Sequence, residues 1–586
     1  LIMAKAFAKG TQFTLHIHYR GTPTNTGIGY SLWEWQKEGE ARVRRYAKTM
    51  FQPVRARSAV PCFDEPALKA TFKVSMITRS EYTSLNDMPA EKETMYDTQE
   101  EVYGLFPERV RTRDDWKITH FGKTPRMCTY ILTFTTGEFE HLESAYVSPI
   151  TGERKPVRLL PTSFIVLGAA FILSVIAPAL PLYESLFGVA YPHPKLDTLV
   201  ATGYGGGMEN WGFVITSDDA SLVDPNFADL PKQRKAMSHI AREENHPSGE
   251  GFTTIICDQL YPEWDSGHAQ MSSLDTGLKL ASKPSSHSAP RQGGREREQE
   301  VQQREYTATF LCAIFDMNMH YLGQDVFVRG IQIYLKRYLY GNTVRQDLWT
   351  ALGEAGDHRR RPIADSSFTQ TGFPLLTVTE TVSEVPSGGL RTSQDRYLET
   401  GLADGDANVL WHVPPGGATY TTTKILLTER ETIVPCDLHF PHKLNYGKHG
   451  FYRVLYSGAT SRKVADVRLS GVKIPTRDRI GFVNDVATLA KAGLMRADEV
   501  LTVYEVFIKD SREYLVLQAV AAGLSIIASI WWDDAAVLSS LKTWERAVWH
   551  PIFDDLGFEN KPGDSDSTRA VRSLVVPRLA DARDVG

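Results

Sequence analysis

The chain has 586 residues, of which 42% are hydrophobic and 23% are charged, a composition typical of a globular protein with several cores. By length it should contain about three to five domains. Its net charge of −5 excludes the basic face that a nucleic acid or an acidic membrane surface would require, so we expect neither kind of partner.

Cysteine usage indicates a reducing compartment. The chain has five cysteines, and none forms a CxxC pair, so neither a disulfide framework nor a cysteine zinc site is expected. The first residues, Leu1 to Phe7, carry too short an apolar run for a signal peptide. A cytoplasmic location is therefore predicted.

The first part of the chain, residues 1–155, is predicted to be a β-rich domain. Polar residues alternate with β-branched and aromatic ones over 11–19 and over 129–136. A period of two is typical of strands with one buried face.

Residues 156–375 are predicted to form a mixed domain with more helix. Residues 326–338 have helical spacing of their apolar positions. The apolar run from Phe164 to Leu180 is close to the length of a membrane span, but it has Pro178 near its end and no flanking basic anchor. We interpret it as a buried core helix, with a membrane span as the alternative.

Strand patterns return at 372–379, which predicts a small β-sandwich over residues 376–465. Residues 466–586 are predicted to be helical. Val516, Val520, Leu524 and Ile527 follow the three-and-four spacing of one buried helical face.

A glycine run stands out at Tyr204-Gly-Gly-Gly-Met-Glu-Asn-Trp-Gly212. Glycine has no Cβ and lets the backbone approach a ligand closely. Glu209 could pair with an ammonium group, and the amide of Asn210 offers a donor and an acceptor. The segment is predicted to bind a free amine; the alternative is a tight turn with a surface glutamate.

Gly206-Gly-Met-Glu-Asn210 resembles the GAMEN signature of the zinc aminopeptidase N family. Further segments resemble blocks of that family in the same order, and together they cover nearly the whole chain. These are residues 51–66, 124–130, 187–197, 340–349, 443–454 and 478–485.

The resemblance implies an α+β multidomain fold. Its parts would be a saddle-shaped N-terminal β domain, a thermolysin-like central domain, a β-sandwich and a helical C-terminal domain. It further implies that the chain starts inside the first sheet and stops partway through the helical array, so both ends are expected to be truncated.

The resemblance also implies an activity. Members of the family release N-terminal residues from peptides with the help of Zn²⁺, so peptides with a free N-terminus are the expected partners. The substrate-binding residues carried over from the motif are Gly206, Gly207, Met208, Glu209 and Asn210. The oligomeric state is not indicated.

The zinc ligands of the family do not transfer fully. The family uses HExxH, with a third ligand in an NEGF segment, and this sequence contains no HExxH. Glu250-Gly-Phe252 resembles NEGF, so Glu250 is a candidate ligand, and His246 and His239 are the nearby imidazoles.

Spacing argues against a regular zinc site here. Residues seven apart on a helix lie about 10 Å apart along its axis, too far for His239 and His246 to share a zinc ion with bonds of about 2 Å. His246 and Glu250 are four apart, but Pro247 and Gly249 oppose a helix between them. The alternative is that all three are solvated loop residues.

The family also uses a tyrosine to stabilise the oxyanion, a role worth several kcal/mol in such sites. Counting back from Tyr321-Leu-Gly323, the nearest candidate is Tyr306. Otherwise Tyr306 is a partly buried aromatic. We therefore interpret the chain as an aminopeptidase-family member with a disrupted zinc motif, the alternatives being an inactive peptide-binding paralogue and the product of a defective gene model.

Overall fold

The computed structural model describes two compact units, treated separately below. One comprises residues 1–247 with 335–343, and the other comprises 248–334 with 344–586. The described residues are 8, 10–36, 40–96, 115–162, 166–222, 278, 313–356, 366–367, 370, 372–381, 388–398, 401–402, 409–414, 426–435, 438, 442–466 and 474–583.

The first unit begins with two antiparallel sheets, which confirms a β-rich N-terminal domain. One has the order β1-β2-β7-β4 and the other β3-β6-β5. The strands are β1 (Gly29–Gln36), β2 (Val43–Met50), β7 (Phe134–Gly137), β4 (Thr83–Asn86), β3 (Ser75–Arg79), β6 (Trp116–Phe121) and β5 (Ala90–Met95).

Two of the sequence-predicted strands differ from the structure. Residues 11–19 belong to no strand among the described residues, and Phe13 is 58% exposed. Alternation yields a strand only when a neighbouring strand supplies the ladder hydrogen bonds, and no described strand pairs with this segment. Thr129–Ile131 forms a short 3₁₀ turn, η3, and β7 starts only at Phe134.

A third sheet in this unit has the order β11-β12-β10-β9-β8 and is mixed: β10 pairs parallel with β9 and β12, and the two outer pairs are antiparallel. Its strands are β8 (Leu142–Val147), β9 (Arg154–Pro161), β10 (Leu196–Ala201), β11 (Gly207–Asn210) and β12 (Phe213–Ser217). Every residue of β10 is buried, as expected for a central parallel strand covered on both faces. β8 thus joins this sheet although residues 1–155 were assigned to the N-terminal domain; the domain boundaries themselves remain predictions.

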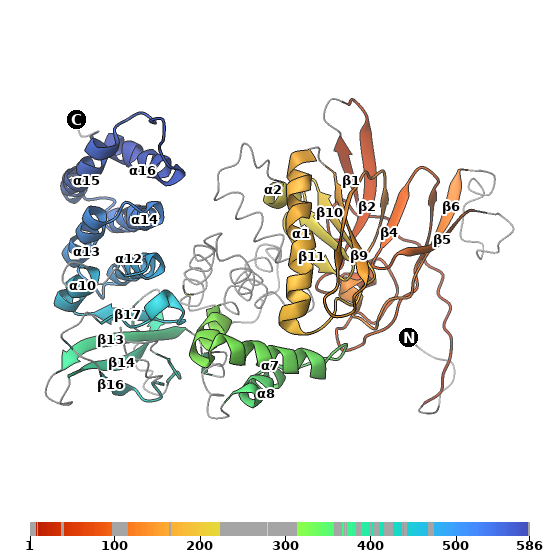
Figure 1. The fold of residues 1–586 in the computed structure, drawn as a ribbon, viewed down its shortest axis with the longest axis horizontal. Coiled ribbons are helices and arrows are strands. Elements are labelled where there is room, and N and C mark those ends of the chain that lie inside the picture. The colour runs from red at the N-terminus through yellow and green to blue at the C-terminus, as the bar shows by residue number, and fades with distance from the viewer. Residues whose placement is uncertain are drawn as a thin grey trace. The chain divides into compact units, whose positions relative to one another are not determined.

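Helix α1 (Val166–Phe187) lies along this sheet (Figure 1). By length and composition it could cross a membrane. However, Ile172 and Ile176 pack with Val157 and Leu159 of β9 in one buried cluster. The apolar run is therefore a core helix in this structure, because its hydrophobic side chains are used to cover a sheet.

The second unit contains a helix over residues 313–322, then α7 (Gln324–Arg337) and α8 (Arg345–Ala355). A mixed sheet follows, with the order β15-β14-β13-β17, and β16 also pairs with β14. Its strands are β13 (Phe373–Thr381), β14 (Gly389–Leu398), β15 (Gly401–Leu402), β16 (Glu431–Pro435) and β17 (Arg453–Tyr456). The described residues of this region form one sheet, and the sandwich stays a prediction.

The C-terminal helices stack in successive layers (Figure 1). They are α10 (Gly458–Ala465), α12 (Thr476–Lys491), α13 (Ala497–Asp510), α14 (Tyr514–Ile530), α15 (Ala535–Leu556) and α16 (Asp566–Arg583). The predicted apolar face of α14, from Val516 to Ile527, is fully buried. Gly523 allows close packing there, since a Cβ on it would lie 2.0 Å from the Tyr504 hydroxyl of α13.

Candidate functional site

The glycine-rich segment forms β11, the terminal strand of its sheet in the described chain, and the turn that follows it. β11 pairs antiparallel with β12, so that Glu209 lies opposite Val214. Met208 and Asn210 are buried, at 0% and 3% exposure, whereas Glu209 is only half-buried. Because side chains alternate along a strand, Glu209 projects to the opposite face from Met208 and Asn210.

Space is open where the glycine run enters β11. No described atom lies within 4 Å of the position that a Cβ would take on Gly205 or Gly206. Gly206 also has φ +124°, which side-chain-bearing residues rarely adopt. No packed neighbour therefore requires a glycine at position 205, and the backbone there is accessible to a ligand.

Gly212, in the turn after β11, is in contrast enclosed. It has φ +76°, and a Cβ would lie 2.3 Å from the carbonyl oxygen of Asp87. Its N–H donates to the Tyr191 hydroxyl over 3.1 Å, and its carbonyl accepts from Lys195 Nζ over 2.7 Å. The turn is thus fixed by hydrogen bonds to both the N–H and the carbonyl of Gly212.

The residues that fix this turn form a buried ionic group. Lys195 Nζ lies 2.8 Å from Asp197 Oδ2, and Arg158 binds the same carboxylate through two nitrogens at 2.6 and 2.7 Å. Burial lowers the pKa of Lys195, while the charge of Asp197 opposes that shift. The sequence segment ending in Pro-Lys-Leu-Asp197 therefore positions the strand that carries Glu209.

Aromatic rings line the same turn. His193 packs edge-to-face on Trp211 at 5.6 Å between ring centroids, and Trp211 meets Tyr340 at 5.9 Å. Burial, with the charges of Lys195 and Lys155, lowers the pKa of His193 to about 3. The imidazole is neutral near pH 7 and serves as packing rather than as an acid or a base.

Sequence reasoning missed Lys48, a fully buried residue of β2. Its Nζ lies 3.8 Å from the ring centroid of Tyr204, at the start of the glycine run, and 5.0 Å from that of Trp33. Nζ has no hydrogen-bond partner among the described residues, and burial lowers the pKa of Lys48 to about 7. A single lysine in a strand-like sequence does not predict this contact, because the rings of Trp33 and Tyr204 come from other elements of the fold.

The other predicted site residues, Glu250, His246, His239 and Tyr306, lie outside the described residues and remain predictions. Within the described part of the chain, one group of three side chains could hold a metal ion: Asp316, His320 and His449, all in the second unit. Burial lowers the pKa of His449 to about 4, although its contact with Asp316 opposes that shift.

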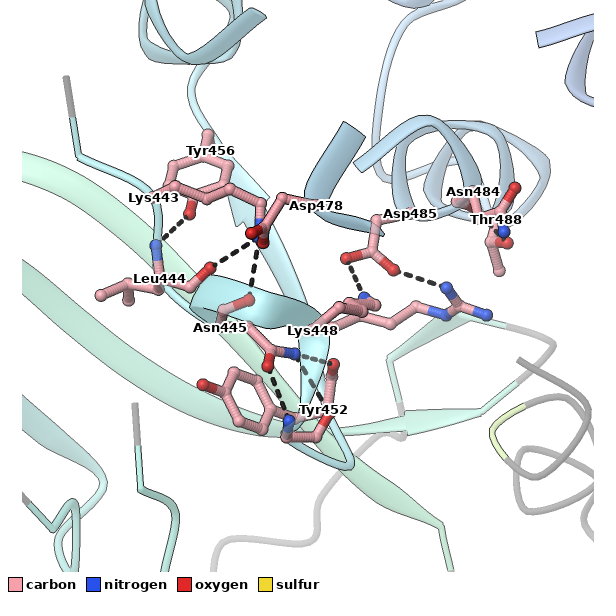
Figure 2. Close-up of polar contacts among 12 residues, drawn as sticks. Lys443, Leu444, Asn445, Lys448, Tyr452, Tyr456, Asp478, Asn484, Asp485 and Thr488 are labelled. Atoms are coloured by element: carbon pink, nitrogen blue, oxygen red, sulfur yellow. Dashed lines mark hydrogen bonds and ion pairs between the residues drawn. The ribbon is translucent and has the colours of Figure 1, made fainter. Parts of the chain in front are cut away.

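The remaining sequence motifs form buried groups of hydrogen bonds and ion pairs, called polar frames here. In the second unit, the Asp478 carboxylate contacts Lys443 and accepts from the Gly447 N–H over 2.8 Å. Asp485 binds Lys448 at 2.6 Å and Arg453 at 2.5 Å. Figure 2 shows both aspartates reaching from α12 to the loop before β17.

A similar frame lies in the first unit. The Asp64 carboxylate accepts from the Arg57 N–H over 3.0 Å and from the Thr129 hydroxyl over 2.6 Å. The Cys128 thiol donates to the Pro66 carbonyl over 3.4 Å. The segments 51–66 and 124–130, distant in sequence, are therefore bonded to each other.

A β-rich domain followed by a sheet with a Gly-Met-Glu-Asn edge strand, and then by a helical array, defines a multidomain protein of the α+β class. Family models support this class over most of the chain. The Peptidase M1 N-terminal domain matches residues 2–131, the Peptidase family M1 domain matches 171–248 and 249–366, and the ERAP1-like C-terminal domain matches 442–585. The chain therefore belongs to peptidase family M1, the zinc aminopeptidases.

Curated relatives are similar over nearly all of this chain. Aminopeptidase 2 of Candida albicans is 27% identical over 98% of the chain and 62% of its own length. Puromycin-sensitive aminopeptidase of Caenorhabditis elegans is 28% identical over 92% and 57%, and glutamyl aminopeptidase of Mus musculus is 25% identical over 96% and 60%. The chain spans about 60% of the length of these relatives.

Proposed function

We propose that this chain binds peptides by their free N-terminus, with Glu209 as the anchor, and that residues 1–586 alone release N-terminal residues slowly. The observation that carries the binding proposal is the half-buried carboxylate of Glu209 on an edge strand beside accessible glycine backbone. The slow release is proposed from the missing HExxH segment.

The chemistry of the anchor is that of a charge-assisted hydrogen bond. A carboxylate accepts from an ammonium group, and such bonds contribute about 1.5–3 kcal/mol. The ionic group around Lys195 holds the following turn, so the strand needs little reordering when a peptide binds. An extended peptide could also add its main chain along the outer edge of β11.

Zinc, when bound in this family, activates a water molecule and polarises the scissile carbonyl. The described residues of the first unit contain no group of three metal-ligating side chains near Glu209. The candidate ligands from sequence, Glu250, His246 and His239, lack the spacing of a regular two-histidine helix. We assign no hydrolytic step through a metal, and a peptide-binding protein without catalysis is the second candidate function.

The proposed ligands of the protein and its cellular location follow from the same sequence features. Peptides with free N-termini would be the partners, and the cysteine pattern favours the cytoplasm as their compartment. No nucleic acid partner is proposed, since the net charge is negative.

Binding can be tested with a fluorescent peptide in two forms, with a free and with an acetylated N-terminus. Anisotropy titrations should show that the intact protein prefers the free form, and that Glu209→Gln reduces this preference by about 10- to 100-fold. Glu153→Gln, at an exposed turn of the same unit, is the matched control and should change nothing. Equal affinity for both peptides in the unmodified protein would refute the anchor.

Catalysis is tested separately. The dialysed protein is assayed for release of an N-terminal amino acid and for bound zinc. Turnover should be far below that of an intact relative measured beside it. Rapid turnover that a chelator abolishes and zinc restores would show that His239 or His246 forms a working site.

A further inference from the structure

Three potential metal ligands meet in the second unit, on elements distant in sequence. Asp316 and His320 are four residues apart on the helix over 313–322 and therefore share one face. His449 comes from the loop before β17. Arg477, in the first turn of α12, reaches the same carboxylate, with a nitrogen 2.8 Å from Asp316 Oδ2.

The donor atoms are already close together. His449 Nδ1 lies 2.9 Å from Asp316 Oδ2, and His320 Nδ1 lies 3.5 Å from Asp316 Oδ1. The two imidazole rings are stacked, with centroids 3.0 Å apart and planes at 16°. One ligand atom from each side chain can be chosen so that all three lie within 4.8 Å of one another.

The carboxylate has an unsatisfied oxygen at this point. Asp316 is only 6% exposed, and its Oδ1 is buried without a hydrogen-bond partner in the described chain. A buried acceptor that lacks a partner costs about 1–3 kcal/mol. Since Oδ2 is used by His449 and Arg477, Oδ1 is the atom that a bound cation would satisfy.

The loop holds His449 in one orientation. A Cβ on Gly447, which has φ +74°, would lie 2.4 Å from His449 Nε2, so Nε2 faces Gly447 and Nδ1 faces Asp316. Asp478 accepts a hydrogen bond from the Gly447 N–H. Figure 2 shows Asp485 bound to the side chain of Lys448. The ligand is thus fixed by the buried frame rather than carried on a mobile side chain.

We propose that Asp316, His320 and His449 bind one divalent transition metal ion, for which zinc is the probe. One carboxylate oxygen and two imidazole nitrogens suit zinc, cobalt, nickel or copper, whereas magnesium and calcium prefer oxygen ligands alone. Bonds of about 2.0–2.2 Å place neighbouring ligand atoms of a tetrahedral ion roughly 3.3–3.5 Å apart. The 3.5 Å between His320 Nδ1 and Asp316 Oδ1 matches that spacing. His449 Nδ1 is now bonded to Oδ2 at 2.9 Å, so it must turn from Oδ2 toward the ion on Oδ1.

Binding requires a small change of protonation. The ion replaces the proton on His449 Nδ1, and the neutral ring carries its one proton on Nε2 instead. Arg477 keeps its hydrogen bond to Oδ2 and orients the carboxylate as an outer partner. The three ligands are different residues from Glu250, His246 and His239, and the proposal does not depend on the proposed aminopeptidase function.

Equilibrium dialysis of the metal-stripped chain of residues 1–586 against zinc, with elemental analysis of bound metal, tests the proposal. It should be done in the background Glu250→Gln with His246→Asn and His239→Asn, so that the other candidate ligands do not contribute. One equivalent of zinc should bind, and His320→Asn or His449→Asn should weaken binding at least 10-fold.

His550 supplies the matched control. It forms an exposed pair with Asp554, also four residues apart on a helix, with Nδ1 and Oδ2 3.0 Å apart and without a third ligand in the described chain. His550→Asn should leave zinc binding unchanged. Cu²⁺ electron paramagnetic resonance should report two coordinated nitrogens, and one after either site substitution.

Two results would overturn the proposal. One is the same zinc affinity in His320→Asn as in the background protein; because the His320 side chain is 47% exposed, this variant should fold. The other is the absence of bound zinc in the background protein together with a normal far-ultraviolet circular dichroism spectrum, which would leave Asp316, His449 and Arg477 as a structural ion-pair group only.

Discussion

Replacing Lys48 with methionine should stabilise the first unit. Lys48 is fully buried, its Nζ has no hydrogen-bond partner among the described residues, and burial lowers its pKa from 10.5 to about 7. Such a shift corresponds to a cost of about 4 kcal/mol for folding at pH 7. The rings of Tyr204 and Trp33 favour the charged form by about 0.5–2 kcal/mol, so a net cost of about 2–4 kcal/mol remains.

The sign of the pH dependence follows from the direction of the shift. Between pH 7 and 10.5 the unfolded chain binds the Lys48 proton and the folded chain largely does not. The free energy of unfolding should therefore rise with pH by up to about 1.4 kcal/mol per unit in this window, and Lys48 should contribute no slope well below pH 7. Methionine has a similar shape and no charge, so Lys48→Met should remove this contribution.

Urea unfolding followed by tryptophan fluorescence at pH 6, 7, 8 and 9 measures the effect. Lys48→Met should raise the free energy of unfolding by about 2–4 kcal/mol at pH 7, and its advantage over the unmodified protein should shrink at pH 9. Lys92→Met, at an exposed position of β5, is the control and should behave as the unmodified protein. An unchanged or lower stability for Lys48→Met at pH 7 would refute the reasoning.

Three further results are expected. Asp485→Asn removes the carboxylate shared by Lys448 and Arg453. Urea unfolding followed by circular dichroism should show that the free energy of unfolding falls by about 3–5 kcal/mol. A fall below about 1 kcal/mol would mean that the two cations find other acceptors. Gly212→Ala should destabilise the first unit by at least about 1 kcal/mol, because φ is positive and its Cβ meets a backbone oxygen. Gly205→Ala, by contrast, should fold normally but weaken peptide binding in the anisotropy assay; unchanged binding would mean that no ligand uses the open space.

The order of the domains could be predicted from sequence because it depends on local patterns and on motifs. The helix at 166–187 was indicated by the length and flanks of its apolar run, and the buried face of α14 by the spacing of its apolar residues. The segment at 11–19 shows the limit of this reasoning, since its alternation is strand-like while its hydrogen-bond partners are set by the rest of the chain.

The candidate site was predictable only in part. Glu209 and its glycines could be proposed from sequence because neighbours in sequence remain neighbours on a strand, and their role in binding stays a prediction. Lys48 and the group of Asp316, His320 and His449 were not found, because each is assembled from elements far apart in the chain. Spacing rules detect ligands on one helix or in one loop, as they would for Asp316 and His320, but the third ligand requires the fold.

The bonding between motif segments bears on how such chains evolve. Asp64 with Thr129, Lys195 with Gly212, and Asp478 with Lys443 each tie one family motif to another within the interior. Substitutions at these positions are selected against as long as the protein must fold, whether or not it cleaves a bond. A gene copy that is no longer selected for catalysis would therefore keep these segments for as long as its product still has to fold. Its catalytic residues, in contrast, would accumulate substitutions.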